Sequence, residues 1–230
     1  MDKIINLYHG SSQIAEVPEF GKGKEHNDFG LGFYCTENIE LAKEWAVSSI
    51  SNGFSNQYTL NTEYLKVLDL NSPEFSILNW IAVLLKYRVF PIKTPIARRA
   101  KQYLLDNFYV NVNAYDIVIG YRADDSYFDY AEAFVNNALS VDQLARAMRL
   151  GKLGEQVVIK SKYAFSLLQY QGFDTAEKDT YYVLRKARDD EANQAYFKMA
   201  EEDDDGLYVR DITRGVITND DPRIPRNIPR

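Results

Sequence analysis

Cysteine and histidine are scarce in this chain of 230 residues, which has one cysteine and two histidines. The single cysteine, Cys35, excludes an internal disulfide framework and suits a reducing compartment. No apolar stretch approaches the roughly 20 residues that a membrane-spanning helix needs. The opening residues 1–5 contain too little apolar sequence for a secretory signal. We therefore expect a cytoplasmic protein that has no membrane partner.

The chain also lacks a large excess of charge of one sign. The formal net charge is −6, which gives no general attraction to nucleic acid, although a local basic patch would still permit it. Hydrophobic residues make up 46% of the chain and aromatic residues 13%, a composition that favours a packed globule over a disordered chain. The length is that of one domain of ordinary size, with room for an appendage.

Two motifs near the start carry most of the chemical information. The first is Leu7-Tyr8-His9-Gly10-Ser11, in which a histidine lies between an apolar run and a glycine. The second is Phe29-Gly30-Leu31-Gly32-Phe33-Tyr34, in which a tyrosine follows two closely spaced glycines. Glycine lets a ligand approach the backbone closely, and a tyrosine face attracts a cationic ring by about 0.5–2 kcal/mol. Together the motifs favour a flat, polar, positively charged ring such as nicotinamide as the ligand.

These residues resemble the ADP-ribosyltransferase superfamily, in the branch that contains diphtheria toxin and the poly(ADP-ribose) polymerases. That branch has a His, a Tyr and a Glu on three separate strands, and its polymerase members are similar to the His9-Gly10-Ser11 and Gly30-x-Gly32-x-Tyr34 motifs. The chain looks closer still to a poorly characterised bacterial family of single-domain transferases, through Asp28-Phe29-Gly30-x-Gly32-Phe33-Tyr34 and Trp45. The resemblance covers residues 4–170.

The resemblance implies an α+β fold with an ADP-ribosyltransferase-like split β-sheet core. It assigns residues 1–175 to the catalytic domain and leaves 176–230 as a charged, helical and acidic extension. It also implies that NAD binds as a consumed substrate, with His9 on the adenosine ribose and the Gly10 backbone on the nicotinamide amide. The residues then expected to contact NAD are His9, Gly10, Ser11, Asp28, Phe29, Gly32, Tyr34 and Trp45.

Each of these side chains also has a plain structural interpretation. His9 would otherwise be a core histidine whose ring nitrogens bond to backbone groups. Tyr34 would otherwise be one of the chain's seventeen tyrosines, packed in the core. Trp45 either forms the second wall of the nicotinamide site or packs in the core. A neutral His9 is expected to donate a hydrogen bond to a ribose hydroxyl. No metal is expected, because His26 and Cys35 lack ligand spacing.

The third catalytic element falls on Glu155 or Gln156, at the head of an expected strand 156–160. Adjacent strand residues point to opposite faces, so only one of the two enters a pocket. A carboxylate stabilises developing positive charge and activates an acceptor, which favours Glu155. The bacterial family, however, is similar to this chain in having a glutamine where Gln156 stands. A glutamine can form a hydrogen bond with a ribose hydroxyl, but it cannot act as a base.

We therefore expect a mono-ADP-ribosyltransferase that transfers ADP-ribose from NAD to a protein or nucleic acid and releases nicotinamide. Many bacterial relatives of this size and pattern are intracellular toxins restrained by an antitoxin protein, and that analogy extends to this chain only as analogy. Two alternatives stay open. One is a catalytically degraded module that binds NAD or ADP-ribose, and the other is a scaffold whose glycine motifs are only turns.

Local patterns predict the secondary structure around these motifs. Strands are expected at 4–9, 65–70, 115–120 and 156–160, with an exposed loop at 21–28. Caps predict helices that begin after Asn38, Ser72, Thr94 and Ser140, the first of them placing Ile50 on its apolar face and the last ending at Gly151. Further helices are expected at 127–138, 163–170 and 185–199. The acidic run 201–205 is a solvated segment or part of a docking arm.

Overall fold

Two mainly antiparallel sheets form the centre of the molecule. The computed structural model describes residues 3–123, 125–150, 154–202 and 205–227. In the first sheet, β1 (Ile4–Ser11), β3 (Gly53–Asn61) and β7 (Gln169–Ala176) pair antiparallel in the order β1-β3-β7. The second sheet has the order β2-β6-β5-β4, with β2 (Phe33–Cys35), β6 (Glu155–Ile159), β5 (Ile117–Tyr121) and β4 (Val67–Asp69).

A single bridge ties the two sheets together. Tyr8 and Thr36 exchange both backbone hydrogen bonds, at 2.8 and 3.0 Å, where β1 passes the end of β2. In the second sheet β2, β6 and β5 pair antiparallel, and only β4 runs parallel to β5. The bridge places the end of β1 beside β2 and β6, so residues from three strands meet there.

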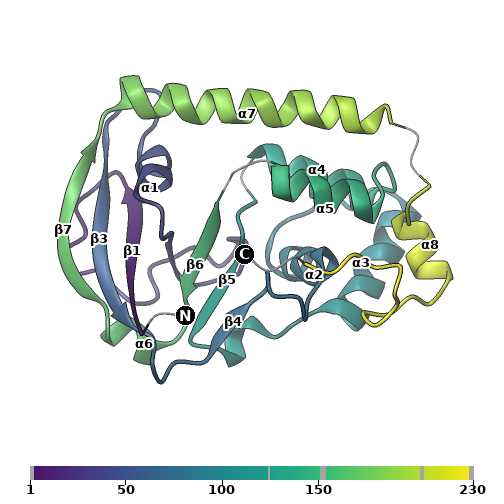
Figure 1. The fold of residues 1–230 in the computed structure, drawn as a ribbon, viewed down its shortest axis with the longest axis horizontal. Helices are drawn as coiled ribbons and strands as arrows, with labels where there is room; N and C mark the ends of the chain where they lie inside the picture. Colours follow the sequence, from purple (N-terminus) through teal and green to yellow (C-terminus); the bar gives the residue numbers. More distant parts are fainter. Residues whose placement is uncertain (1–2, 124, 151–153, 203–204, 228–230) are drawn as a thin grey trace.

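Helices surround the sheets, and the longest lies across the top of both (Figure 1). The shorter ones are α1 (Ile39–Ala46), α2 (Ile77–Tyr87), α4 (Asp125–Val135), α5 (Val141–Leu150), α6 (Lys162–Ser166) and α8 (Val209–Arg214). The longer ones are α3 (Pro95–Phe108) and α7 (Lys178–Ala200), and a 3-10 turn lies at Val112–Ala114. Helices α2 to α5 cover one side of the second sheet, whereas α1 lies against the first.

Strand alternation divides the core into two halves. On β6, Val157 and Ile159 pack with β1 and β3 residues such as Leu7 and Leu60. Val158 points the other way and packs with α2 to α5. This period of two fixes which side chains of β6 face each side of the sheet. The fold is accordingly α+β, as the alternating patterns predict.

Several predicted helix starts are confirmed by their caps. Asn38 Oδ1 accepts from the backbone N–H groups of Glu40 and Leu41, and Thr94 Oγ1 accepts from Ala97 N at 3.0 Å, with Pro95 as the first helical residue. The capping box at Ser140 is complete, because Ser140 and Gln143 each bond the other's backbone N–H. The predicted end of this helix, Gly151, lies outside the described residues.

Several predicted helix boundaries are wrong. Helix α7 begins at Lys178 rather than Arg185, and α4 ends at Val135 rather than Ala138. Helix α2 begins after Ser76 rather than Ser72, because a capping box with Asn79 satisfies its first turn. Helix α1 ends at Ala46, and Ile50 is 86% exposed instead of lying on its apolar face. The helix expected at 163–170 is the short α6, after which the chain enters β7.

Strands β3 and β7 have no counterpart among the predicted elements. Strand β3 contains the polar residues Ser55, Asn56 and Gln57. Strand β7 lies at the edge of the sheet, and every second one of its residues is exposed. A strand's apolar alternation disappears when polar side chains occupy buried positions on both of its faces, and the neighbours Ser55 and Asn56 are both 0% exposed. Non-local pairing, of β3 with β1 and of β7 with β3, decides the structure of these strands.

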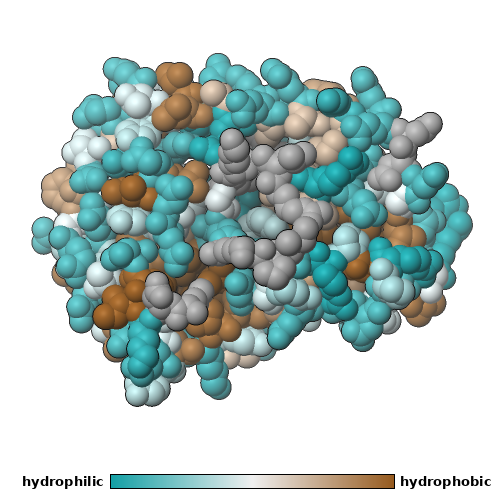
Figure 2. All heavy atoms as spheres, in the orientation of Figure 1, coloured by the Kyte–Doolittle hydropathy of each residue, from teal (hydrophilic) through white to brown (hydrophobic). Residues whose placement is uncertain are grey.

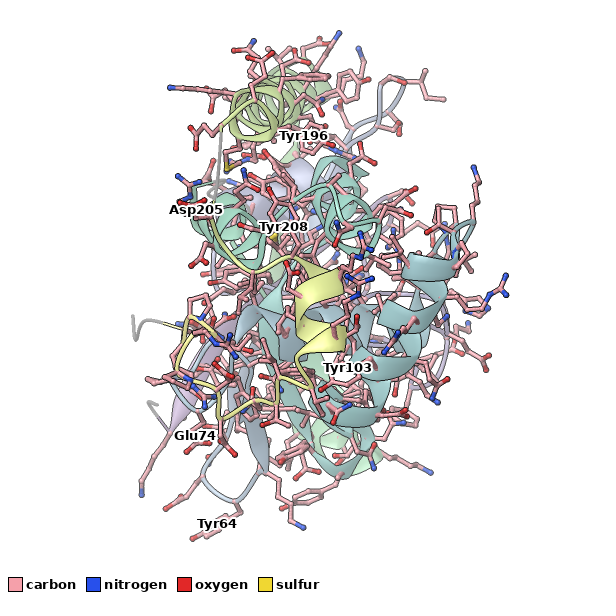
Figure 3. All side chains as sticks on the ribbon, turned by 90° about the vertical axis from the view of Figure 1, so that its right-hand side faces the viewer. Tyr64, Glu74, Tyr103, Tyr196, Asp205 and Tyr208 are labelled. Carbon is pink, nitrogen blue, oxygen red and sulfur yellow. The ribbon has the colours of Figure 1, made fainter. Side chains whose placement is uncertain are left out.

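The C-terminal extension packs against the rest of the molecule. Helix α7 contacts α1, α4 and α5, and α8 contacts α3. Seen from that end, α8 lies in front of α3, whose Tyr103 donates a hydrogen bond to Ile217 O at 3.0 Å (Figure 3). Val209 and Ile212 are fully buried, so the segment beyond the acidic run packs against the rest of the chain. Two of the five acidic residues lie outside the described ranges.

The surface seen in Figure 2 is mainly hydrophilic, with hydrophobic residues in small separate patches. Among the residues that the structure describes, none of the helices combines the length and the apolar character of a membrane span.

Candidate functional site

A cavity of about 710 Å³ opens where β1, β2 and β6 meet. Small-molecule sites commonly have volumes between about 300 and 1,000 Å³. Its walls include the predicted residues His9, Gly10, Asp28, Gly32, Tyr34, Trp45 and Gln156. Much of the remaining wall comes from residues 15–31, in the long connection between β1 and β2, and a long connection without regular structure is commonly functional.

His9 lies on β1 with its ring fixed from two directions. Its Nδ1 lies 2.7 Å from the backbone oxygen of Tyr34, and its ring stacks on Phe33 at 4.4 Å between centroids. Because a carbonyl oxygen only accepts, Nδ1 carries the hydrogen. Burial lowers the pKa of His9, so the ring is neutral at neutral pH and Nε2 is an acceptor. The expectation that His9 donates to a ligand is therefore wrong, since its one N–H is used by Tyr34.

Tyr34 shapes the glycine loop that precedes it. Its hydroxyl accepts from Phe29 N at 3.0 Å and donates to Gly30 O at 2.6 Å. Burial raises the pKa of Tyr34, so the phenol stays protonated and does not serve as a base. Gly30 has φ +74°, a left-handed conformation that suits glycine. The ring of Tyr34 lines the cavity while its hydroxyl holds the loop.

Gly10 and Ser11 differ in their positions. Gly10 lines the cavity, and a Cβ there would lie 2.1 Å from Ala42 O, so only glycine lets β1 approach α1 this closely. Ser11 is not among the lining residues. Its hydroxyl donates to Gln13 O at 2.5 Å and accepts from Asn56 Nδ2 at 3.0 Å, which braces the chain as it leaves β1.

Asp28 is buried at the back of the cavity, 4% exposed, and the loop prediction for 21–28 is wrong at this residue. Its Oδ1 accepts from Arg88 Nη1 at 3.0 Å, and its Oδ2 accepts from Ala123 N at 2.9 Å and from Gln156 Nε2 at 2.7 Å. Burial raises the pKa of Asp28, whereas these hydrogen bonds and the charge of Arg88 oppose the rise. Three donors converge on this carboxylate.

Gln156 and Glu155 lie on opposite faces of β6. Gln156 is 3% exposed and lines the cavity, on the face of β6 that also carries Val158, which is paired with Tyr34. Glu155 lies on the other face, where its Oε1 accepts from Asn71 Nδ2 at 2.5 Å and where it lines a separate hollow beside Asn38. The strand register thus brings Gln156, and not Glu155, together with His9 and Tyr34.

Cationic side chains gather around this cavity although the whole chain is acidic. Among the described residues of its lining, six cations face two acids: Lys22, Lys24, Arg88, Arg122, Lys160 and Arg185 against Glu19 and Asp28. The guanidinium of Arg122 lies 4.4 Å from the centre of the Trp45 ring, a cation–π contact at the cavity wall. Arg185 comes from α7, so the C-terminal extension supplies part of the wall. Such a site suits an anionic ligand.

Lys160 holds the glycine loop from the side opposite Tyr34. Its Nζ donates to Phe29 O at 2.7 Å and to Leu31 O at 2.5 Å, and burial lowers its pKa to about 8. Phe29 itself is fully buried in the core and is not among the lining residues. At Gly32, which does line the cavity, a Cβ would lie 2.5 Å from Val158 Cγ1, so the loop depends on glycine to approach β6.

Several cavity residues have no part in the sequence prediction: Arg88, Arg122, Lys160 and Arg185. Asn56, which braces the chain after β1 but is not among the lining residues, is not part of that prediction either. Arg122 follows the end of β5 directly and Lys160 follows the end of β6, and charged residues just after a strand are a usable signal. Arg185 sits within a run of charged helical residues and carries no such signal.

A family model described as a protein of unknown function (DUF3990) matches residues 5–170, more than half of the chain. No curated protein and no solved structure matches the chain.

Proposed function

The chain belongs to the DUF3990 family, whose function is unknown, and we propose that it is a mono-ADP-ribosyltransferase. It would transfer ADP-ribose from NAD to a macromolecular acceptor and release nicotinamide. The observation that carries this proposal is the meeting of His9, Tyr34 and Gln156, from three different strands, around one cationic cavity. The resemblance described above implies a His, a Tyr and a Glu on three strands, and the bacterial family is similar to this chain in a glutamine at position 156.

The cavity walls suit the separate parts of NAD. The Tyr34 ring offers a face for the nicotinamide, and the backbone of Gly10 lies within reach of a carboxamide. Neutral His9 accepts a hydrogen bond from a ribose hydroxyl through Nε2. The cations around the opening, Arg122 and Arg185 among them, match the negative charge of a pyrophosphate. We propose the split-sheet arrangement of this superfamily as the fold that supports this binding.

The transfer step breaks the bond between C1′ of the ribose and the nicotinamide nitrogen. The bonding electron pair leaves with nicotinamide, and an oxocarbenium-like sugar forms. A nucleophile of the acceptor then bonds to C1′ and loses its proton. Gln156 stabilises the positive sugar through a hydrogen bond to a ribose hydroxyl but does not remove the proton. The acceptor nucleophile therefore enters already ionised or passes its proton to water.

A second candidate function, an NAD- or ADP-ribose-binding module without catalysis, is favoured by the amide at position 156. A glutamine in place of a carboxylate supplies no base, and Asp28 behind it is committed to three donors. Such a module would bind NAD and leave it intact. Both candidates need the same cavity, and turnover separates them.

The test of the proposed function is incubation of the purified protein with NAD labelled in both halves, with and without cell extract. We expect labelled nicotinamide to be released and a mass of one ADP-ribose to appear on an extract protein or nucleic acid. Gln156→Ala should reduce release about 10²-fold, the scale of losing one transition-state contact. Glu155→Ala, one residue along β6 but on the other face, is the matched control and should change release less than about threefold.

The outcomes of this experiment distinguish the transferase from the non-catalytic binding module. Binding of NAD without release by the wild type favours the binding module. A larger loss from Glu155→Ala than from Gln156→Ala would contradict the assignment of Gln156 to the chemistry. If growth arrest on expression in a bacterial host disappears with Gln156→Ala, the toxin analogy gains support, and co-purification of a restraining protein would identify the antitoxin.

A further inference from the structure

The hydrogen bond between Gln156 and Asp28 determines which end of the glutamine amide faces a ligand. A carboxylate can only accept hydrogen bonds, and Asp28 Oδ2 lies 2.7 Å from Gln156 Nε2. The amide therefore turns its NH₂ group to Asp28. Its oxygen, Oε1, is left on the other side of the same planar group. Because Gln156 lines the cavity, the oxygen is the end available to a bound molecule.

Nothing in the glutamine alone fixes this choice. The oxygen and nitrogen of a side-chain amide are nearly equal in size, so a half turn about the last torsion exchanges donor and acceptor without a packing penalty. With Nε2 outward, Gln156 would donate to a ligand; with Oε1 outward, it accepts. A partner of fixed polarity is needed to select one of the two.

Asp28 has the properties of such a partner. It is 4% exposed, and two further donors, Ala123 N at 2.9 Å and Arg88 Nη1 at 3.0 Å, hold its carboxylate in place. Arg88 and Arg122 bring positive charge to it, and Tyr34 is the other titratable group close by. Burial raises the pKa of Asp28, but the ion pair with Arg88 and the two N–H donors on one oxygen oppose this rise and favour the ionised carboxylate, which has no hydrogen to donate.

We propose that Asp28 is a positioning residue that fixes the Gln156 amide with Oε1 toward the cavity, so that Gln156 serves as a hydrogen-bond acceptor for a ligand hydroxyl. This inference rests on the proposed function for the identity of the ligand, a ribose of NAD. The pair replaces a single glutamate: Asp28 supplies the polarity and Gln156 the contact. Asp28 acts on the ligand through Gln156.

The first test removes the polarity while it keeps the shape. In Asp28→Asn, residue 28 can donate as well as accept, so the amide of Gln156 turns freely. Affinity is measured for NAD and for NAD that lacks the 2′-hydroxyl on the nicotinamide ribose. For the wild type we expect the missing hydroxyl to weaken binding about 10-fold, as one buried hydrogen bond does. For Asp28→Asn we expect this ratio to fall to about twofold or less.

A reversed pair provides the rescue. In Asp28→Asn with Gln156→Glu, residue 28 donates through its NH₂ group and residue 156 accepts with both oxygens, while the local charge is the same as in the wild type. We expect the 10-fold discrimination to return, while the thermal midpoint stays below that of the wild type, because Ala123 N loses its acceptor. A merely structural role for Asp28 predicts a lower midpoint in the single variant with an unchanged ratio. An unchanged ratio in Asp28→Asn, or no ratio in the wild type, overturns the proposal.

A second measurement is independent of NAD. In the ligand-free protein, the side-chain NH₂ group of Gln156 should give two separate NMR resonances, one of them protected from exchange by the bond to Asp28. In Asp28→Asn this protection should be lost, while glutamines elsewhere, such as Gln143, are unaffected. A freely exchanging Gln156 amide in the wild type overturns the inference. Absence of NAD binding with a protected amide would instead contradict the proposed function alone.

Discussion

Removing one partner of the ion pair between Arg188 of α7 and Glu44 of α1 should strongly destabilise the molecule. Arg188 Nη2 lies 2.7 Å from Glu44 Oε1, and Arg188 Nε lies 3.1 Å from Glu44 Oε2, so the guanidinium binds both carboxylate oxygens. The Glu44 side chain is 7% exposed and that of Arg188 is 24% exposed. Arg188→Met removes the guanidinium and leaves a nearly buried carboxylate without it.

The expected loss follows from this burial. Removing one partner of a fully buried ion pair costs about 3–5 kcal/mol. Because Arg188 is about a quarter exposed, water reaches the site, and we expect a smaller loss than that range, about 2–3 kcal/mol. For a domain of this size each kcal/mol lowers the thermal midpoint by about 2–4 °C, so Arg188→Met should melt about 4–12 °C below the wild type.

Calorimetry or circular dichroism on heating measures this shift, and two variants interpret it. Lys186→Met changes an exposed cation on the same helix and should shift the free energy of unfolding by no more than about 0.5 kcal/mol. Glu44→Leu with Arg188→Leu removes both charges and should recover most of the loss, because a buried apolar pair needs no desolvation of charge. A midpoint for Arg188→Met within about 1 °C of the wild type would refute the reasoning.

Three further expectations concern the cavity. Lys160, whose pKa is lowered to about 8, should be acylated faster at pH 8 than the exposed Lys162. Bound NAD should protect Lys160 from this reaction. Equal rates for the two lysines, measured by mass spectrometry, would contradict the burial that lowers the pKa of Lys160. Arg185→Met should weaken NAD binding about 3- to 10-fold in a titration, whereas Lys186→Met should not, if the C-terminal extension is part of the site. His9 has a lowered pKa, so the unfolded chain takes up its proton first as the pH falls below about 6.5, and stability falls. The thermal midpoint should therefore drop more between pH 7 and 5 in the wild type than in His9→Asn, and parallel curves would argue against a neutral, buried His9.

Local sequence was sufficient wherever a structure depends on neighbours along the chain. Asn38, Thr94 and Ser140 cap helices as their sequence contexts predict, because each side chain bonds backbone groups within three residues. The period of two in β6 also indicated that Glu155 and Gln156 point in opposite directions. It did not indicate which of them meets His9, since the register against β2 and β5 decides this.

Contacts between distant segments were beyond prediction from the sequence. Strand β3 contains buried Asn56, which bonds Ser11, Gln13 and Ala15 across the sheet, and a polar strand of this kind has no apolar alternation to reveal it. The Asp28–Gln156 bond joins residues that are 128 positions apart. Arg185 reaches the cavity only because α7 crosses the molecule, which nothing in its own charged helix indicates.

The central claim is that the cavity between β1, β2 and β6 binds NAD. Calorimetric titration of NAD into the wild type, His9→Ala and Tyr34→Ala tests it most directly, with the thermal midpoint of each variant as a check of folding. The account predicts one site per chain in the wild type, at least 10-fold weaker binding in both variants, and an NAD-dependent rise of the wild-type midpoint. Absence of NAD binding by the folded wild type, or equal affinity in all three proteins, would contradict it.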